Sequence, residues 1–385
     1  MEICKSNVWN SPLPSELLEE ICSHLGIRDL VALKATSRAF LRIEHFLERK
    51  IDRRLDLFVK NPRGFRYLLK EHDAFMAGPF ALDFFLHGTQ TASQMDVYIR
   101  SGPGRVAFSD YLCSLEEYTR VATRSQRADH IQMIEFFSRA DSDIIVRLIV
   151  TNGMPIKALL HGSYTTACVN FITWNKAYSV FPLLTFVRNE AYLLKEMDDN
   201  FGCLLVKYAP LGWTSRNMRW WNVHRGSEAM LRNRAIGGNC SLVVSLGEKG
   251  LGTPRTPDFV LEHAQFSLHG SPYSAALRVT AMTELCSPVL RYTYTFTDDS
   301  WREFAMKRLY MITVAELYKI EPGDRSTQAV RALNSPLNPS TNSWPPAERA
   351  AAIWQLDGFN KPDTWTYADN LIPEWYRAWN PSRKW

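Results

Sequence analysis

The chain has 385 residues, of which 46% are hydrophobic and 22% are charged. This composition is typical of a folded protein with two or three domains, and it excludes a chain that is disordered throughout. The formal net charge of +5 permits contact with an acidic partner without requiring nucleic acid.

The seven cysteines are scattered singly, and no two have the C-x-x-C spacing of a zinc or redox site. The N-terminus, MEICKSNVWN, lacks the apolar segment of a signal peptide, and the longest apolar run, Ile144 to Val150, is too short to span a bilayer. We therefore expect a protein of the cytoplasm or nucleus, with no metal, no cofactor and no membrane segment.

Residues 12–55 show the pattern of three short helices. Four apolar residues at helical spacing give the first helix one apolar face, and these are Leu17, Leu18, Ile21 and Leu25. Ser15 is placed to cap the N-terminus of this helix, and Gly26 is placed to end it.

The next two helices follow from similar signals. Asp29 is placed to cap a second helix that carries Leu30 and Leu33, and Ser37 to cap a third that continues towards Phe58. A segment of this size buries too little of its own surface to be stable alone. We expect another part of the chain, or a partner, to cover much of its apolar face.

The run from Leu13 to Arg38 resembles the F-box, the adaptor-binding motif of substrate receptors in cullin-RING ubiquitin ligases. The resemblance implies an F-box domain at residues 11–57 that binds a Skp-type adaptor and through it a cullin, while the rest of the chain holds a protein cargo. It implies that the adaptor-binding residues are Leu13, Pro14, Leu17, Leu18, Ile21, Leu25, Leu30 and Leu33. The alternative is an ordinary helical hairpin in the core of a larger domain.

Residues 62–190 are the second predicted domain. The stretch Ala74 to Leu86 predicts a buried strand, a turn at Gly78-Pro79 and an amphipathic helix, and Gln94 to Ile99 alternates as a strand does. This order resembles the nucleotidyltransferase fold, which places two carboxylates at i and i+2 of one strand to hold magnesium. Gly78 matches the glycine of the turn and Asp96 the second carboxylate, but Gln94 stands at the first.

The third acid of that family lies on a later strand. The stretch from Asp143 to Phe181 predicts a strand at Ile144 to Val150, a helix near Ile156 and a strand near Cys168. The last positions hold His161, Ser163, Thr165 and Asn170, and none of these is acidic. The resemblance thus implies a degenerate nucleotidyltransferase-like α/β domain with no catalytic residue, as in a set of fungal F-box proteins.

Two side chains of this domain each have two possible roles. Asp96 is either a residual ion-binding group or a solvated or capping acid at a strand end. His161, beside Gly162, is a turn or core residue or a ligand, and we favour the former.

Residues 191–320 are predicted as a mixed α/β extension of the same body. The pattern predicts a helix over Phe186 to Leu205, strands at Ser241 to Leu246 and Val289 to Thr297, and a helix over Asp298 to Ile320. The stretch from Arg216 to Arg234 interleaves basic residues with Trp220-Trp221. Such a stretch can bind single-stranded nucleic acid, but we favour a solvated helix face whose tryptophans point inward.

Residues 321–385 are predicted as a tail rich in proline and tryptophan, with an extended arm from Asp324 to Pro346. Six of the 12 tryptophans lie in this tail, namely Trp344, Trp354, Trp365, Trp375, Trp379 and Trp385. They form either a cargo-contact surface or a clasp that buries the rings against the body, and the clasp is favoured.

We therefore predict an α+β chain with a three-helix F-box, a nucleotidyltransferase-like domain and a helical, tryptophan-rich C-terminal region. Its predicted function is that of a non-enzymatic substrate receptor of an SCF-type ubiquitin ligase, with an unknown protein cargo. One alternative is a nucleotidyltransferase or nucleotide-binding protein that uses Asp96. Another is an interaction module that binds the adaptor without a cullin.

Overall fold

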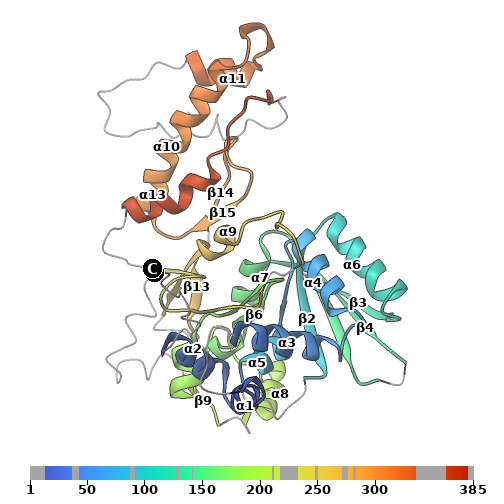
Figure 1. The fold of residues 1–385 in the computed structure, drawn as a ribbon. Coiled ribbons are helices and arrows are strands. Elements are labelled where there is room, and N and C mark those ends of the chain that lie inside the picture. Colours follow the sequence, from blue (N-terminus) through green and yellow to red (C-terminus); the bar gives the residue numbers. More distant parts are fainter. Residues whose placement is uncertain are drawn as a thin grey trace, which may run out of the picture. The chain divides into compact units, whose positions relative to one another are not determined.

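The computed structural model describes residues 14–36, 43–86, 92–126, 130–140, 142–209, 212–216, 233–247, 250–270, 276–280, 283–334 and 361–379 (Figure 1). The chain divides into two compact units. Unit 1 comprises residues 1–227, 240–256 and 269–279, and unit 2 comprises residues 228–239, 257–268 and 280–385. This division does not follow the predicted boundary at residue 320, because residues on both sides of it belong to unit 2.

Unit 1 is a mixed α+β unit. Its helices are α1 (Ser15–Ser23), α2 (Ile27–Thr36), α3 (Ile43–Leu55), α4 (Pro62–Glu71), α5 (Gly78–Phe85), α6 (Pro103–Ser114), α7 (Pro155–Gly162) and α8 (Asp199–Tyr208), with short turns at Thr166–Cys168 and Leu183–Arg188. Its strands are β1 (Phe75–Ala77), β2 (Gln94–Arg100), β3 (Thr119–Ser125), β4 (Ile131–Ser138), β5 (Ile145–Thr151), β6 (Asn170–Ile172), β7 (Lys176–Ser179), β8 (Glu190–Tyr192), β9 (Thr214–Arg216) and β11 (Leu242–Ser245). The strand β13 (Arg278–Thr280) lies at the division between the units.

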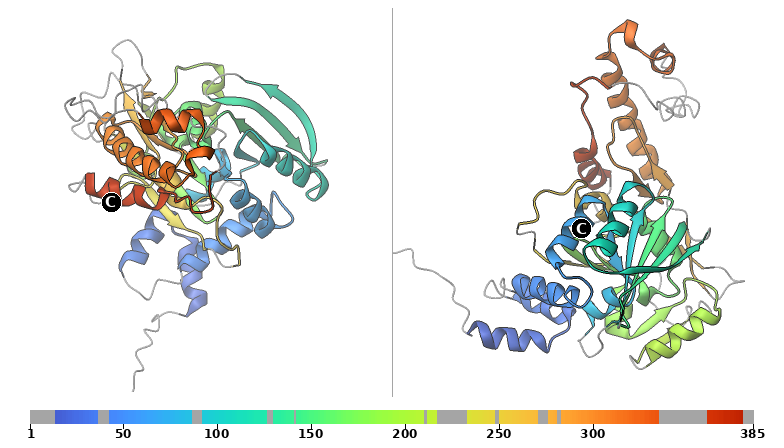
Figure 2. Two further views of the ribbon diagram at one scale, coloured as in Figure 1. Left: turned by 90° about the horizontal axis from the view of Figure 1, so that it is seen from above. Right: turned by 90° about the vertical axis from the view of Figure 1, so that its right-hand side faces the viewer.

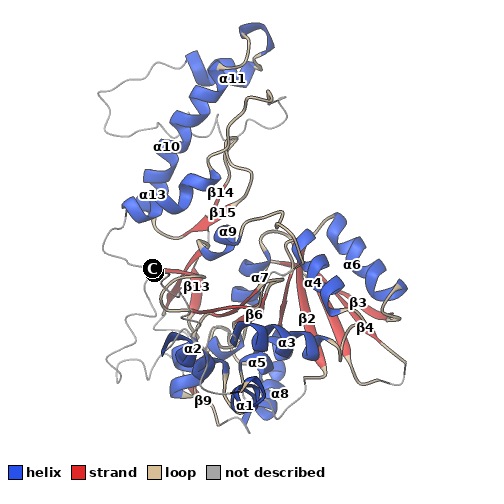
Figure 3. Cartoon of the chain, in the orientation of Figure 1, coloured by secondary structure: helices blue, strands red, loops and turns tan. Residues whose placement is uncertain are grey.

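The centre of unit 1 is an eight-stranded sheet in the order β11-β7-β6-β1-β2-β5-β4-β3, with helices packed beside it (Figure 3). Neighbouring strands are antiparallel except β2 and β5, which are parallel. On β2, Met95, Val97 and Ile99 alternate with Asp96 and Tyr98, and all five are buried, so this central strand is covered on both faces.

The first three helices share the core of this α/β body. Cys22 of α1, Ile27 and Leu30 of α2 and Leu47 of α3 belong to the same buried cluster as Val97 of β2. Helix α2 contacts α5, and α3 contacts α4. The expectation that another part of the chain covers this small three-helix segment is confirmed.

Several local expectations hold in unit 1. The strand, glycine turn and helix around Gly78 are present as β1 and α5, and the strands predicted at Gln94, Ile144 and Ser241 are β2, β5 and β11. Helix α5 is buried from Phe80 onwards rather than amphipathic, since it packs between the sheet and α2.

Others are corrected. Pro14, not Ser15, stands at the cap position of α1, and Asp29 lies in the first turn of α2 instead of capping it. The predicted helix from Phe186 to Leu205 is helical at both ends, in the π-helix Leu183–Arg188 and in α8, but is wrong between them, where Glu190–Tyr192 forms strand β8 beside β9. Here a strand partner far along the chain outweighs the local helix propensity. The start of the third helix at Arg38 lies outside the described residues.

Arg66 of α4 connects four segments of unit 1. Its side chain is 1% exposed, and its Nε donates a hydrogen bond to the carbonyl of Trp174 (2.7 Å). One Nη donates to the carbonyl of Gly247 (2.7 Å), and the other lies 3.3 Å from the carboxylate of Asp52 on α3. Because the planar guanidinium has five N–H groups, one side chain can satisfy buried acceptors on several sides.

Lys50 of α3 is the basis of a pH-dependent prediction. Burial, together with the neighbouring Arg54, lowers the pKa of Lys50 to about 8. In the unfolded chain its pKa is near 10.5, so the protonated lysine destabilises the fold below pH 8, and this cost is lost as the pH rises from 8 to 10.5. We expect Lys50→Met to raise the free energy of unfolding by on the order of 2 kcal/mol at pH 7, and by less at pH 10.

Urea unfolding at both pH values measures this effect. Lys60→Met is the matched control, because the Lys60 side chain is 50% exposed and keeps much of its hydration in the folded protein. A gain from Lys50→Met that is equal at pH 7 and pH 10 would contradict the prediction.

Unit 2 contains β10 (Arg234–Ala235), α9 (Asp258–Glu262), β12 (Gln265–His269), β14 (Thr283–Leu285), β15 (Tyr294–Phe296), α10 (Asp299–Tyr318), α11 (Thr327–Asn334) and α13 (Ile372–Trp379), with short 3-10 turns at Pro322–Asp324 and Asp369–Leu371. The predicted helix at Asp298 is confirmed as α10. The Asp298 side chain caps it by accepting from the N–H groups of Ser300 (3.0 Å) and Trp301 (3.2 Å). The extended arm predicted from Asp324 is wrong in part, since Thr327–Asn334 is helical.

The described helices include none with the length and apolar character needed to cross a bilayer.

Candidate functional site

Helix α1 has two faces of opposite character. Cys22 is 1% exposed and packs into the core of unit 1, whereas Leu17 and Ile21 are 53% and 42% exposed. Leu17 and Ile21 are four residues apart, so they are neighbours on one side of the helix. Two large aliphatic side chains side by side in water are typical of a surface that a partner covers.

Charged groups lie next to this apolar pair. Glu20 of α1 and His24, which follows the last turn of this helix, are both exposed and form a hydrogen bond with 3.1 Å between Oε1 and Nε2. An apolar centre bordered by polar side chains is the usual arrangement of a protein interface. The exposed side of α1 therefore has the character of a docking surface.

The other predicted adaptor-binding residues are placed differently. Leu30 is fully buried inside the chain, and Leu25 and Leu33 pack against the same core. These leucines pack α1 and α2 against the body. Because Leu30 is fully buried there, it cannot contact a partner in this arrangement. Pro14 is exposed, while Leu13 and the side chain of Leu18 lie outside the described residues.

A comparison with protein families identifies the segment to which this surface belongs. The family model of the F-box domain matches residues 11–50, which include α1, α2 and the first part of α3. The chain contains an F-box domain. No curated protein and no solved structure matches the chain. F-box domains in general bind Skp-type adaptors, and an F-box is typical of substrate receptors of SCF-type ubiquitin ligases.

Helix α3, whose first part belongs to the F-box match, is joined to the rest of unit 1 by ion pairs that lie just beyond the matched residues. Arg54 of α3 pairs with Asp83 of α5, and both side chains are largely buried. Arg66 adds the contact to Asp52. These contacts hold α3 against the α/β body of unit 1.

The second candidate site lies where β1, α5 and β2 meet. Asp96 is buried on β2, and Gly78 at the start of α5 lies so close to it that a Cβ at Gly78 would collide with the carboxylate. Gly78 has φ +70°, a conformation that glycine adopts without strain. Gln94 donates from Nε2 to Oδ1 of Asp96 (3.0 Å). The structure thus brings together the three predicted residues of this site.

Arg147 completes this cluster, and the sequence analysis missed it. Its guanidinium binds both oxygens of Asp96, with Nε 2.7 Å from Oδ1 and Nη2 2.5 Å from Oδ2. The parallel pairing of β2 with β5 places Arg147 directly beside Asp96. The one available signal was a charged residue inside the apolar run from Ile144 to Val150.

An arginine in this position supplies the positive charge that a metal ion would bring to Asp96. Among the residues that the structure describes, no three His, Cys, Asp or Glu side chains form a group that could hold a metal ion. The arrangement therefore makes Asp96 a structural ion-pair partner.

His161 makes a ring contact with His130, with 4.8 Å between the ring centroids, and belongs to α7.

The described part of the tail is packed onto unit 2. Trp365 is 7% exposed and donates from Nε1 to the carbonyl of Pro288 (3.2 Å). The buried carboxylate of Asp369 accepts from the N–H of Arg291 (2.9 Å) and the hydroxyl of Tyr294 (3.1 Å). These contacts agree with a clasp for this segment.

Trp375 and Trp379 are partly buried against the same cluster. Trp344, Trp354 and Trp385 lie outside the described residues.

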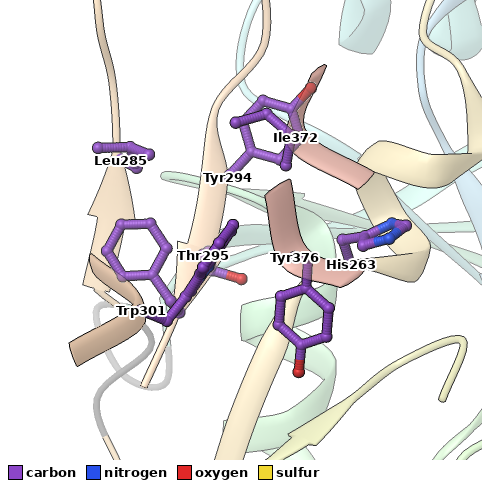
Figure 4. Close-up of a pocket in the computed structure, with 8 residues that line it drawn as sticks. His263, Leu285, Tyr294, Thr295, Trp301, Ile372 and Tyr376 are labelled. Carbon is purple, nitrogen blue, oxygen red and sulfur yellow. The ribbon is translucent and has the colours of Figure 1, made fainter. Parts of the chain in front are cut away.

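A small cavity in unit 2 lies beside this clasp (Figure 4). Its volume is about 10 Å³, enough for one water molecule, and Tyr376, Trp301 and His263 contribute to its lining. Burial lowers the pKa of His263, whose Nδ1 lies 2.8 Å from the carbonyl of Phe259. The cavity is a gap in aromatic packing and is too small for a ligand.

The basic stretch from Arg216 to Arg234 cannot be judged as a whole, because residues 217–232 lie outside the described residues. Arg234 itself is buried over the ring of Phe266 and is a core residue of unit 2.

Proposed function

We propose that this chain is the substrate-recruiting subunit of an SCF-type ubiquitin ligase. Its F-box docks a Skp-type adaptor, the adaptor links it to a cullin, and the remainder of the chain holds a protein cargo. The observation that carries the proposal is the exposed pair Leu17 and Ile21 on a helix within the matched F-box. The chain performs no chemistry itself, but raises the effective concentration of a cargo lysine near the ubiquitin-conjugating enzyme. We place this activity in the cytoplasm or nucleus.

The energetics of docking favour a strong effect of substitution. Burial of Leu17 and Ile21 against an adaptor is worth roughly 1.5–3 kcal/mol for each side chain before ordering costs are subtracted. An aspartate in either place would have to lose its hydration without a partner. A double substitution should therefore abolish capture of the adaptor.

The test is co-purification from cells, with mass spectrometry, of the wild type and the Leu17→Asp/Ile21→Asp variant. We expect the adaptor and a cullin with the wild type and neither with the variant. Val206→Asp on α8 is the matched control, because Val206 is 78% exposed and lies outside the F-box match. Val206→Asp should retain the adaptor.

Three outcomes decide the matter. Absence of the adaptor from the wild type, or its retention by the double variant, would refute docking through α1. Adaptor without cullin would favour the plain interaction module. Cargo candidates are the proteins that both forms retain.

Nucleotidyl transfer is the weaker alternative. Asp96, the one acid of the predicted constellation, is engaged by Arg147 and Gln94 instead of facing further carboxylates. The nucleotidyltransferase-like fold and the kinship with fungal F-box proteins stay predictions from sequence.

A further inference from the structure

Strand β3 ends the eight-stranded sheet of unit 1. Within the described residues it pairs only with β4, and all seven of its side chains are exposed. Figure 2 shows β3 and β4 as a pair of long strands at the margin of the sheet. The outer edge of such a strand presents N–H and C=O groups that another extended chain can bind.

The protection of the β3 edge is partial and consists of two charged side chains, Arg120 and Arg124, and one pairing irregularity. Its sequence, TRVATRS, contains neither proline nor lysine and is rich in β-branched residues, which favour extended pairing. One irregularity in the pairing with β4 lies between Arg120 and Ala122. Beyond it, Ala122 to Ser125 pair regularly with β4, so this half of the strand offers an even edge.

The charges around β3 are positive. Arg120 is 49% exposed, and Arg105 of α6 is 32% exposed beside it. Both bind the same carboxylate, that of Glu135 on β4, which is fully buried. Arg124 is exposed and forms no ion pair with another described residue. Arg124, registered with Ile134, lies on the opposite face of the sheet from Glu135, so the carboxylate meets two of the three arginines and each face of the edge keeps an excess of positive charge.

Apolar side chains accompany these arginines. On β4, Ile134 is paired with Arg124 and Phe136 with Ala122, and both apolar side chains are only partly buried. A segment added along β3 would present acidic and apolar side chains to the face of Arg124, Ile134 and Phe136, and acidic side chains to the face of Arg120, because successive side chains of a strand point to opposite faces.

We propose that the outer edge of β3 binds an extended acidic segment of a cargo protein, which adds to the sheet as a further strand. Backbone hydrogen bonds hold the segment, and its carboxylates pair with Arg124 and Arg120. This inference rests on the proposed function, since it names the class of cargo that the F-box protein would recruit.

The test uses random ten-residue peptides displayed on phage and selected on the immobilised full chain. We expect enrichment of sequences that combine several Asp or Glu residues with β-branched or aromatic residues. The best of these, made as a labelled synthetic peptide, should bind Arg124→Glu about tenfold more weakly than the wild type. Arg302→Glu on α10 is the matched control, with the same change of charge at an exposed arginine, and should bind as the wild type does.

A second probe separates strand addition from simple charge attraction. Two versions of the same peptide, N-methylated at the odd or at the even residues, keep their carboxylates, and the version that loses the N–H groups facing β3 should bind at least tenfold more weakly. No enrichment, enrichment without acidic residues, equal binding to Arg124→Glu, or equal binding of both methylated peptides would each overturn the proposal. Thermal unfolding of Arg124→Glu confirms that the variant is folded.

Failure of this proposal can be distinguished from failure of the proposed function. The Leu17→Asp/Ile21→Asp variant should bind the peptide normally while losing the adaptor. Arg124→Glu should retain the adaptor while losing the peptide.

Discussion

Replacement of Arg66 by methionine is expected to lower the free energy of unfolding by about 3–5 kcal/mol. Methionine fills much of the volume of the arginine stem but donates no hydrogen bond. The carbonyls of Trp174 and Gly247 would lose their buried donors, and Asp52 would lose its nearest cation. Each unsatisfied buried acceptor costs roughly 1–3 kcal/mol, which accounts for the size of the loss.

Denaturant unfolding of purified protein measures this effect. Arg63→Met, on the same helix but exposed, is the matched control and should change stability by less than about 0.5 kcal/mol. Arg66→Lys should fall between the two, because one ammonium group cannot reach acceptors on several sides. A stability for Arg66→Met within about 1 kcal/mol of the wild type would show that water replaces the guanidinium in this place.

The second large effect concerns the ion pair between Asp96 and Arg147. Replacement of the arginine should lower the free energy of unfolding more than replacement of the aspartate. The Asp96 side chain is 5% exposed and that of Arg147 is 30% exposed. Arg147→Met leaves a buried carboxylate with only the amide of Gln94 as donor, and should cost about 3–5 kcal/mol at pH 7. Asp96→Asn leaves an arginine that can turn towards water, and should cost only about 1–2 kcal/mol.

Stability measurements that include a double variant test this asymmetry. Asp96→Asn/Arg147→Met should be more stable than Arg147→Met alone, since neither charge remains. Arg124→Met on exposed β3 serves as the surface control. If Asp96→Asn proved as costly as Arg147→Met, the predicted asymmetry of the pair would be wrong.

Stability and function are linked in this molecule through the shared core. The F-box contributes Cys22, Ile27 and Leu30 to the same cluster as the strands of the body. A variant that loosens this core would also weaken the support of α1, so adaptor capture must be compared among variants of similar stability. The pair Leu17 and Ile21 is suited to this comparison, because both side chains already face water in the chain alone.

Local patterns in the sequence were sufficient for the elements that depend on near neighbours. The spacing of Leu17, Ile21 and Leu25 predicts α1, the alternation from Gln94 predicts β2, and Asp298 marks the start of α10. Helix periodicity, strand alternation and N-terminal caps act over a few residues, so the residues themselves carry these signals. The F-box motif belongs to the same class, because its residues are close together in sequence.

Tertiary structure alone decided which of the motif's leucines face water. Leu17 and Leu30 both look like interface residues in the sequence, but the α/β body covers Leu30 and leaves Leu17 exposed. Likewise, Arg147 lies 51 positions after Asp96 and reaches it only through the parallel register of β2 and β5. The exposed edge of β3 depends on its place at the end of the sheet. Such contacts join distant segments, and strand order and register, which no local pattern contains, determine them.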